Sequence, residues 1–336
     1  HPPFLKLRPL KILFVAMPEA IHTARWVEQL SSTEWDLHLF PSRAVPPVDE
    51  MPPVTFHTLF PAEWQKSRPD IKNSPLIKWR YSRAKERIRQ LQCKRNPLLS
   101  TAAGQLAETI NRIQPDIVHT LEMQLAGYLM NEALPFIKNR SGFKWVYSCW
   151  GNDITFYQSD PRHNQKIRSV LQHIDYYTAD CPRDMRLIKS YQPTAKPLEV
   201  YPTGGGYDLQ KLRDLSSNKP PSKRKIIALK GYHSEEWTGR AINALRAMHL
   251  CKDSLSDFEI VIYRPNGEVK HIAEYLSKFE GLNIRCLPPW IDNLEVVRLM
   301  GQSRIAISTN SGDGTPNAML EAMIMGAFPI QSSTAD

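Results

Sequence analysis

The stretch Ser311-Gly-Asp-Gly-Thr-Pro-Asn-Ala-Met-Leu-Glu-Ala-Met-Ile-Met-Gly-Ala-Phe-Pro-Ile330 predicts a loop, a helix and a strand in immediate succession. Asp313-Gly314 is typical of a turn, Thr315 is a favoured N-cap residue, and Pro316 suits the first helical position. Gly326 is placed to end the helix, because glycine tolerates the left-handed conformation that follows many helices. A helix leading directly into a buried strand is typical of α/β domains.

The predicted helix offers two things to an anionic ligand that carries hydroxyl groups. Its amino end, around Asn317, presents backbone N–H groups and the positive end of the helix dipole, where phosphates commonly bind. Asp313 before the helix and Glu321 inside it supply carboxylates that can accept hydrogen bonds from sugar hydroxyls. Glu321 is the one charged side chain of an apolar helix, so it either faces water or is paired in the interior.

The composition is that of an ordinary globular chain. Of its 336 residues, 42% are hydrophobic and 23% are charged, which suits two domains of roughly 150 residues each. No run approaches the roughly 18 to 20 apolar residues that span a bilayer, and residues 1–9 are too polar for a signal peptide. The five cysteines are scattered, without a CxxC pair. We therefore expect no disulfide framework and no metal site, and a reducing cytoplasm as the compartment.

The positive charge is concentrated in one segment. Residues 63–96 contain eleven basic and three acidic residues, and so carry +8 of the chain's net charge of +9. Residues 76–91 alternate cations with aromatic or aliphatic side chains at helical spacing. The segment is either a solvated helical face or a surface for anionic lipid or a lipid-phosphate acceptor. Nucleic-acid binding is a weaker alternative, because no recognised binding module surrounds the segment.

Short apolar runs with strand character alternate with helical patterns along the chain. The predicted strands cover residues 10–16, 35–40, 54–59, 113–119, 143–149, 174–180, 226–229, 258–263, 283–287 and 305–308. Residues 216–225 are polar, charged and contain proline, which is typical of a linker. We therefore predict an α/β fold with an amino-terminal Rossmann-like domain at 1–212, a linker at 213–225 and a second Rossmann-like domain at 226–336.

Two loops of the first domain carry candidate site residues. In Trp150-Gly-Asn-Asp153, Gly151 permits a turn and Asp153 places a carboxylate where open α/β sheets bind ligands, at the carboxyl ends of the strands. Asp153 is equally suited to cap the helix that follows. His22 follows the first predicted strand and is another candidate, with a helix-capping or surface role as the alternative.

These motifs resemble those of the retaining GT-B glycosyltransferases, most closely glycosyltransferase family 4. The resemblance rests on Asp313-Gly-Thr-Pro followed by Leu320-Glu-Ala-Met. It extends to His22-Thr-Ala-Arg-Trp26, Pro115-Asp-Ile-Val-His119 and Trp150-Gly-Asn-Asp153, and so covers most of the chain. The chain departs from the family at two positions. Asp313 stands where a Glu is usual, and Trp150 stands where many relatives have a His that faces the donor sugar.

The resemblance implies a GT-B architecture, in which two Rossmann-like domains face a cleft that binds a nucleoside-diphosphate sugar without a metal or other cofactor. Glu321 would hold the ribose hydroxyls and Asp313 would touch the transferred sugar. Lys230 and Arg240 would neutralise the diphosphate, and Asp153 would take part of the role of the missing histidine. The other residues that the resemblance places around the donor are Gly314, Thr315, Pro316, Asn317, Gly151 and His22.

The predicted function is transfer of a sugar from a nucleoside-diphosphate sugar to a glycan or lipid-linked acceptor, with retention of configuration. We expect a cytoplasmic enzyme that contacts the anionic inner face of the cell membrane through residues 63–96, and no nucleic-acid partner. Relatives continue for several elements past the corresponding position, so the resemblance implies an incomplete second domain. The alternatives are a sugar-nucleotide epimerase with the same fold and a non-catalytic sugar-nucleotide-binding protein.

Overall fold

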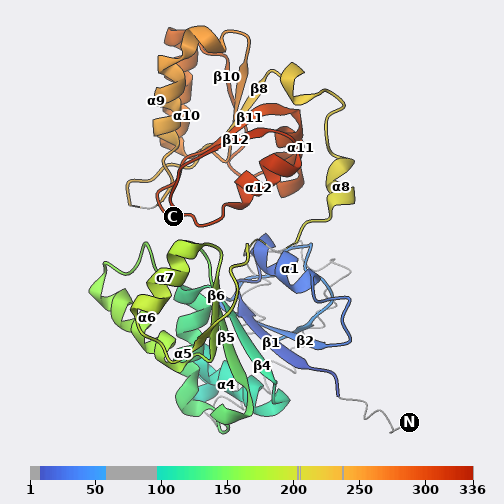
Figure 1. Ribbon diagram of the computed structural model, residues 1–336, viewed down its shortest axis with the longest axis vertical. Helices are drawn as coiled ribbons and strands as arrows, with labels where there is room; N and C mark the ends of the chain where they lie inside the picture. The colour runs from blue at the N-terminus through green and yellow to red at the C-terminus, as the bar shows by residue number, and fades with distance from the viewer. Residues whose placement is uncertain (1–7, 58–96, 203, 205, 237, 336) are drawn as a thin grey trace. The chain divides into compact units, whose positions relative to one another are not determined.

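The chain forms two compact units, each built on its own parallel β-sheet (Figure 1). The structure is a computed structural model, which describes residues 8–57, 97–202, 204, 206–236 and 238–335. The first unit ends at Gly206 and the second begins at Tyr207. The predicted basic segment, residues 63–96, lies outside the described residues. Among the described residues, none of the helices has the length and the apolar composition that a membrane-spanning helix needs.

The sheet of the first unit has seven strands in the order β3-β2-β1-β4-β5-β6-β7, and every neighbouring pair is parallel. The carboxyl ends of all these strands therefore lie at one edge of the sheet. The strands are β1 (Lys11–Ala16), β2 (Asp36–Pro41), β3 (Thr55–Phe56), β4 (Ile117–Leu121), β5 (Lys144–Cys149), β6 (Tyr176–Ala179) and β7 (Lys196–Pro197).

Helices cover both faces of this sheet because its strands are apolar on both faces. They are α1 (Ile21–Glu28), α4 (Ala102–Ile113), α5 (Tyr128–Ala133), α6 (Pro161–His173) and α7 (Pro182–Ser190), with a π-helical turn, η3, at Met123–Gly127. Leu13 and Val15 of β1 pack into the core cluster that contains α4, α5, α6 and α7. Ile12 and Phe14 of the same strand point the other way and pack against α1.

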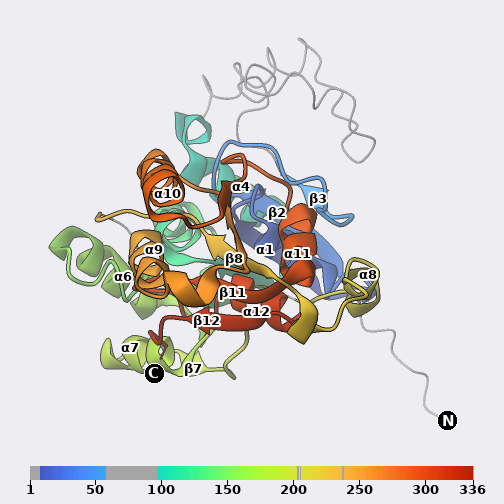
Figure 2. The same ribbon diagram turned by 90° about the horizontal axis from the view of Figure 1, so that it is seen from above.

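The second unit repeats this layout around five parallel strands in the order β10-β9-β8-β11-β12. The strands are β8 (Ile226–Lys230), β9 (Glu259–Tyr263), β10 (Ile284–Cys286), β11 (Ser303–Ser308) and β12 (Phe328–Gln331). The helices are α8 (Leu209–Arg213), α9 (Ala241–Leu250), α10 (Gly267–Glu280), α11 (Asn293–Gln302) and α12 (Asn317–Ile324). Helices α9 and α10 pack on one face, and α11 and α12 on the other (Figure 2). The structure confirms the predicted α/β class, with two Rossmann-like units that each have their own parallel sheet.

The end of the predicted linker, 213–225, is bonded to the second unit. Arg224 is buried, and its Nη1 donates to the carbonyl oxygens of Ser303 at 3.2 Å and Met325 at 2.9 Å. Its Nε donates to the carbonyl of Lys219 at 3.1 Å. The Arg224 guanidinium thus satisfies carbonyls at the start of β11 and the end of α12, which joins this segment to the core of the unit.

Candidate active site

The amino end of α12 forms the centre of the candidate site in the second unit. The prediction of Thr315 as N-cap is wrong by one residue, because Pro316 is the N-cap and Asn317 begins the helix. Pro316 has extended ψ of 129°, and its carbonyl accepts from the N–H groups of Met319 at 3.0 Å and Leu320 at 3.2 Å. The first N–H groups of a helix have no carbonyl partner within it. The amino end of α12 therefore begins at Asn317, directly after Gly314, Thr315 and Pro316.

Glu321 lies one turn inside α12 and is buried, with 5% of its surface exposed. Its Oε1 accepts from the amide of Asn293 on α11 at 3.3 Å. Burial, and then the negative charge of Glu321, raise the pKa of Tyr263 at the end of β9. The alternative of a Glu321 that faces water is therefore wrong, and the carboxylate is paired as its apolar helix required.

Asp313 and Lys230, which the sequence places 83 positions apart, meet at the carboxyl edge of the sheet. Lys230 is the last residue of β8 and Asp313 follows β11, and these strands are neighbours. The Lys230 Nζ lies 4.0 Å from the Asp313 Oδ2, with both side chains partly exposed. An ammonium and a carboxylate are thus side by side near the amino end of α12.

Arg240 lies at the N-cap position of α9, in the loop that follows β8. Its guanidinium donates to the carbonyl oxygens of Ser234 and Gly239 in the same loop. Its backbone N–H donates to the carbonyl of Thr309 at 3.0 Å, so this loop is joined to the one that follows β11. Arg240 thus braces the loop beside Lys230.

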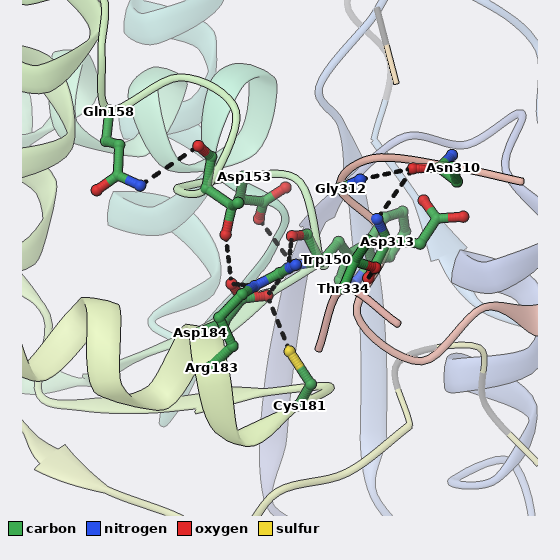
Figure 3. Close-up of polar contacts among 12 residues, drawn as sticks. Trp150, Asp153, Gln158, Cys181, Arg183, Asp184, Asn310, Gly312, Asp313 and Thr334 are labelled. Carbon is green, nitrogen blue, oxygen red and sulfur yellow. Dashed lines mark hydrogen bonds and ion pairs between the residues drawn. The ribbon is translucent and has the colours of Figure 1, made fainter. Parts of the chain in front are cut away.

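Three polar residues that support this site were not predicted from the sequence. Asn293 contacts Glu321, and the hydroxyl of Tyr207 donates to the Asn317 Oδ1 at 2.9 Å. The third is Asn310, whose Oδ1 accepts from the N–H groups of Gly312 and Asp313 (Figure 3). The role of Asn310 could have been predicted from its place at the start of a turn, because an Asn side chain there can accept a hydrogen bond from the backbone N–H two residues ahead.

In the first unit, the predicted run Trp150-Gly-Asn-Asp153 forms a tight loop after β5 (Figure 3). Asp153 is buried, and its Oδ2 accepts from the Trp150 N–H at 2.9 Å and the Tyr147 hydroxyl at 3.0 Å. Gly151 has φ of +52°, and its carbonyl accepts from the guanidinium of Arg183. Asp160, not Asp153, caps the following helix α6. The capping alternative for Asp153 is therefore wrong, and its carboxyl group holds the loop closed.

Glu122, which was not predicted from the sequence, is a buried residue whose negative charge acts on Asp153. It follows β4 with φ of +76°, a conformation that a residue with a side chain rarely adopts. Its carboxylate accepts from the N–H groups of the next turn, those of Gln124, Leu125 and Ala126, at 2.6 to 2.9 Å. Burial raises the pKa of Glu122 to about 7. Burial, and then the charge of Glu122, raise the pKa of Asp153 well above its usual range.

His22 packs against the Trp150 ring in an edge-on contact, with ring centroids 5.8 Å apart. It lies in the first turn of α1, whose N-cap is Ala20, so the capping alternative for His22 is wrong. His119 in β4 is buried and shares a hydrogen bond of 2.8 Å with the Ser148 hydroxyl. Burial lowers the pKa of His119 to about 3, so this histidine is neutral in the folded protein.

One group of side chains in the described residues has the proximity of a metal site, namely Asp180, Cys181 and Asp184. Asp184 is already engaged, because its Oδ1 lies 2.9 Å from the Arg183 Nε and accepts from the Thr155 hydroxyl at 2.8 Å (Figure 3). Burial raises the pKa of the Cys181 thiol to about 12, which disfavours the thiolate that a metal requires. The group is better described as a buried ion-pair network.

A model of the glycosyl transferase 4-like family matches residues 11–181, just over half of the chain. The chain belongs to this family. The match confirms the family that the motifs indicated, and with it the enzyme class, a glycosyltransferase. A search of curated protein sequences returned no match.

Solved structures with the same fold as this glycosyl transferase 4-like chain share little of its sequence. The UDP-forming α,α-trehalose-phosphate synthase of Burkholderia xenovorans, in complex with glucose-6-phosphate, is 12% identical with a TM-score of 0.62, over 97% of this chain and 86% of that one. HepE of Anabaena, in complex with UDP and glucose, is 12% identical with a TM-score of 0.61, over 97% and 81%. A protein assigned as a UDP-N-acetylglucosamine 2-epimerase from Listeria monocytogenes is 12% identical with a TM-score of 0.57, over 96% and 79%. These likenesses confirm the GT-B fold.

Proposed function

We propose that this glycosyltransferase moves a sugar from a nucleoside-diphosphate sugar to a hydroxyl group of a glycan or lipid-linked acceptor, with retention of configuration. The observation that carries the proposal is the convergence at one sheet edge of Lys230, Asp313 and the amino end of α12, with the buried Glu321 one turn further along. This edge combines positive charge for a diphosphate with carboxylates for sugar hydroxyls. The complexes of HepE with UDP and glucose and with UDP-glucose support a donor of this class.

In the proposed reaction, the bond between the anomeric carbon and the diphosphate breaks, and its electron pair leaves with the diphosphate. Lys230, Arg240 and the first N–H groups of α12 stabilise that negative charge, which is the largest electrostatic change of the reaction. The acceptor oxygen bonds to the anomeric carbon from the face that the diphosphate leaves, and its proton passes to a diphosphate oxygen. Glu321 accepts hydrogen bonds from the ribose, and Asp313 from the transferred sugar.

We propose that no metal takes part, because this chain's own cations supply the charge that a divalent ion supplies in other transferases. The test is activity in excess EDTA compared with activity in added Mg²⁺ or Mn²⁺. Equal rates are expected in both conditions. A rate that EDTA abolishes and Mg²⁺ restores would overturn this part of the proposal.

The sharpest test of the donor site is Glu321→Gln, which keeps the shape of the side chain and removes its charge. We expect at least a hundredfold loss in kcat/KM, equivalent to about 2.7 kcal/mol or more, because a buried carboxylate that binds hydroxyl groups is lost. Glu295→Gln, at an exposed position of α11, is the matched control and should have the same kcat/KM as the unmodified protein. Near-normal transfer by Glu321→Gln would refute the assignment.

A sugar-nucleotide epimerase is the second candidate, favoured by the structural likeness to the Listeria protein. The two reactions differ in what they release and in what they require. A transferase releases nucleoside diphosphate in proportion to acceptor consumed, and an NMR spectrum of the product shows the anomeric configuration of the donor. An epimerase converts the sugar nucleotide without any acceptor. Conversion in the absence of acceptor would favour the second candidate.

We further propose that the enzyme works in the cytoplasm and reaches a lipid-linked acceptor through peripheral contact of residues 63–96 with an anionic membrane surface. The +8 charge of this segment supports the proposal, because each Lys or Arg near such a surface contributes about 1 kcal/mol of attraction.

A further inference from the structure

The loops that follow β8 and β11 are joined to each other by a run of hydrogen bonds. The N–H of Arg240 donates to the carbonyl of Thr309 at 3.0 Å, and the Thr309 hydroxyl donates back to the carbonyl of Arg240 at 2.8 Å. Further on, the Ser311 N–H donates to the carbonyl of Thr238 at 2.9 Å. Residues 238–240 and 309–311 thus pair as a short antiparallel bridge that lies beyond the parallel sheet.

Asn310 stands at the centre of this bridge with only 7% of its surface exposed. Its Oδ1 accepts from the N–H of Gly312 at 2.8 Å and the N–H of Asp313 at 3.1 Å (Figure 3). Its Nδ2 donates to the hydroxyl of Thr238, itself 2% exposed, at 3.1 Å. One side chain therefore fixes the turn before Asp313 and ties that turn to the loop after β8.

The segment after β12 completes the support of the same turn. The Ser332 hydroxyl accepts from the backbone N–H of Asn310 at 3.0 Å. The Thr334 hydroxyl donates to the carbonyl of Asp313 at 2.6 Å (Figure 3). Asp313 is thus held at its N–H by Asn310 and at its carbonyl by Thr334, which leaves its peptide units little rotational freedom.

We propose that Asn310 is a positioning residue for the donor site, which sets the backbone of Asp313 so that its carboxylate faces Lys230. The inference rests on the proposed function and adds a residue to it. Lys230 lies at the end of a rigid strand, whereas Asp313 lies in a loop, so the 4.0 Å separation of their charged atoms depends on the conformation of that loop. Asn310 acts through Asp313 and does not itself contact the donor.

The chemistry of the position favours an amide. The turn needs an acceptor for two backbone N–H groups, and the Thr238 hydroxyl needs a donor or an acceptor in a site that water does not reach. Asn supplies both from one short side chain. Replacement by Ala leaves buried polar groups unsatisfied, and each such group costs about 1 to 3 kcal/mol. The loop is then expected to rearrange and to move the Asp313 carboxylate away from Lys230.

The test measures sugar-nucleotide binding by titration calorimetry. Four sugar nucleotides are first titrated into the unmodified protein, namely UDP-glucose, UDP-N-acetylglucosamine, GDP-mannose and ADP-glucose. The one that binds most tightly is the probe. Asn310→Ala is expected to raise its Kd about tenfold, equivalent to about 1.4 kcal/mol. Thr238→Val, which removes one hydrogen bond, should raise the Kd less, and Thr238→Ser, which restores the hydroxyl, should return it to within about twofold.

A double-mutant cycle separates positioning from a merely structural role. In an Asp313→Ala background, Asn310→Ala should change the Kd by less than about twofold, because the residue through which it acts is gone. The control is Asn164→Ala in the first unit, which loses hydrogen bonds to Gln158 and Tyr191 and should lower stability without changing the Kd.

Two results would overturn the inference while the proposed function stands. One is a Kd of Asn310→Ala for the sugar nucleotide that equals the Kd of the unmodified protein. The other is a tenfold rise in Kd caused by Asn310→Ala that persists in the Asp313→Ala background. If the unmodified protein binds none of the four sugar nucleotides, the proposed function fails and this inference fails with it.

Discussion

Glu122 combines three features that each cost free energy. Its backbone has φ of +76°, its carboxylate is buried, and its negative charge acts on Asp153, which is also buried. Three N–H groups of the following turn offset part of this cost by donating to the carboxylate. Such concentrated strain and buried charge are typical of functional regions. Both residues lie at the carboxyl edge of their sheet, beside the loop that places Trp150 against His22.

The raised pKa of Glu122 predicts a stability that depends on pH. Its pKa rises from 4.5 to about 7 on folding, chiefly because of burial, so the folded state favours the protonated form. This contribution is complete below pH about 4.5 and is lost as the pH rises through about 7. The loss amounts to up to about 3 kcal/mol. Urea unfolding at pH 5 and pH 8 should therefore show the unmodified protein losing stability relative to Glu122→Gln as the pH rises.

Glu280→Gln serves as the control for this experiment. Glu280 has a partly exposed side chain, and its hydrogen bond with Lys252 lowers its pKa. Its contribution to stability is thus already complete above pH about 4.5. The difference in stability between the unmodified protein and Glu280→Gln should therefore not change between pH 5 and pH 8. A flat profile for Glu122→Gln as well would contradict the assignment of a near-neutral pKa to Glu122.

At the scale of the element, α12 shows where local pattern suffices and where it does not. Gly326 was predicted to end this helix, and the structure confirms it, with φ of +77° directly after the C-cap Met325. The amino end was predicted one residue early. A β-region ψ at Pro316 decided the start of the helix, and sequence pattern does not specify the ψ of a residue in a loop.

The left-handed conformation of Gly326 gives a prediction for Gly326→Ala. An added Cβ would meet only ordinary contacts, the nearest being the Pro221 Cγ at 3.5 Å, so the cost comes from the backbone alone. We expect a loss of about 1 kcal/mol in the free energy of unfolding, measured by urea. Gly267→Ala at the start of α10 is the matched control. Its Cβ would meet nothing within 4 Å, and stability should be unchanged or slightly higher. Equal effects of the two substitutions would contradict the strain argument.

For the whole molecule, the sequence was sufficient for the fold and for the family, because these depend on short apolar strands and local motifs. It was insufficient for contacts between distant polar residues. Nothing local to Asn310 indicates that its amide meets Thr238, 72 positions away. The same limit applies to Asp153, because a carboxylate after a strand is equally able to bind a ligand, cap a helix or close its own loop. In the structure, the Asp153 carboxyl group closes its own loop, because it accepts hydrogen bonds from the Tyr147 hydroxyl and the Trp150 N–H.

The basic segment at residues 63–96 gives a prediction for the behaviour of the whole protein at a membrane. The variant neutralises Arg83, Lys85, Arg87 and Arg89 to Gln, which lowers the charge of the segment from +8 to +4. Co-sedimentation with vesicles of phosphatidylcholine and phosphatidylserine should fall at least tenfold, because each removed cation forfeits about 1 kcal/mol of surface attraction. Binding of the unmodified protein should also weaken steeply as salt rises, because ions screen these charges.

The control for membrane binding must change the net charge equally at another place. Arg186, Lys189, Lys211 and Arg213 are exposed, and their substitution by Gln removes four cations outside the basic segment. This control should bind vesicles nearly as well as the unmodified protein if the segment acts locally. Equal loss in both variants would show that net charge alone drives binding. Vesicle binding by the variant in 63–96 that equals binding by the unmodified protein would show that this segment does not contact the membrane surface.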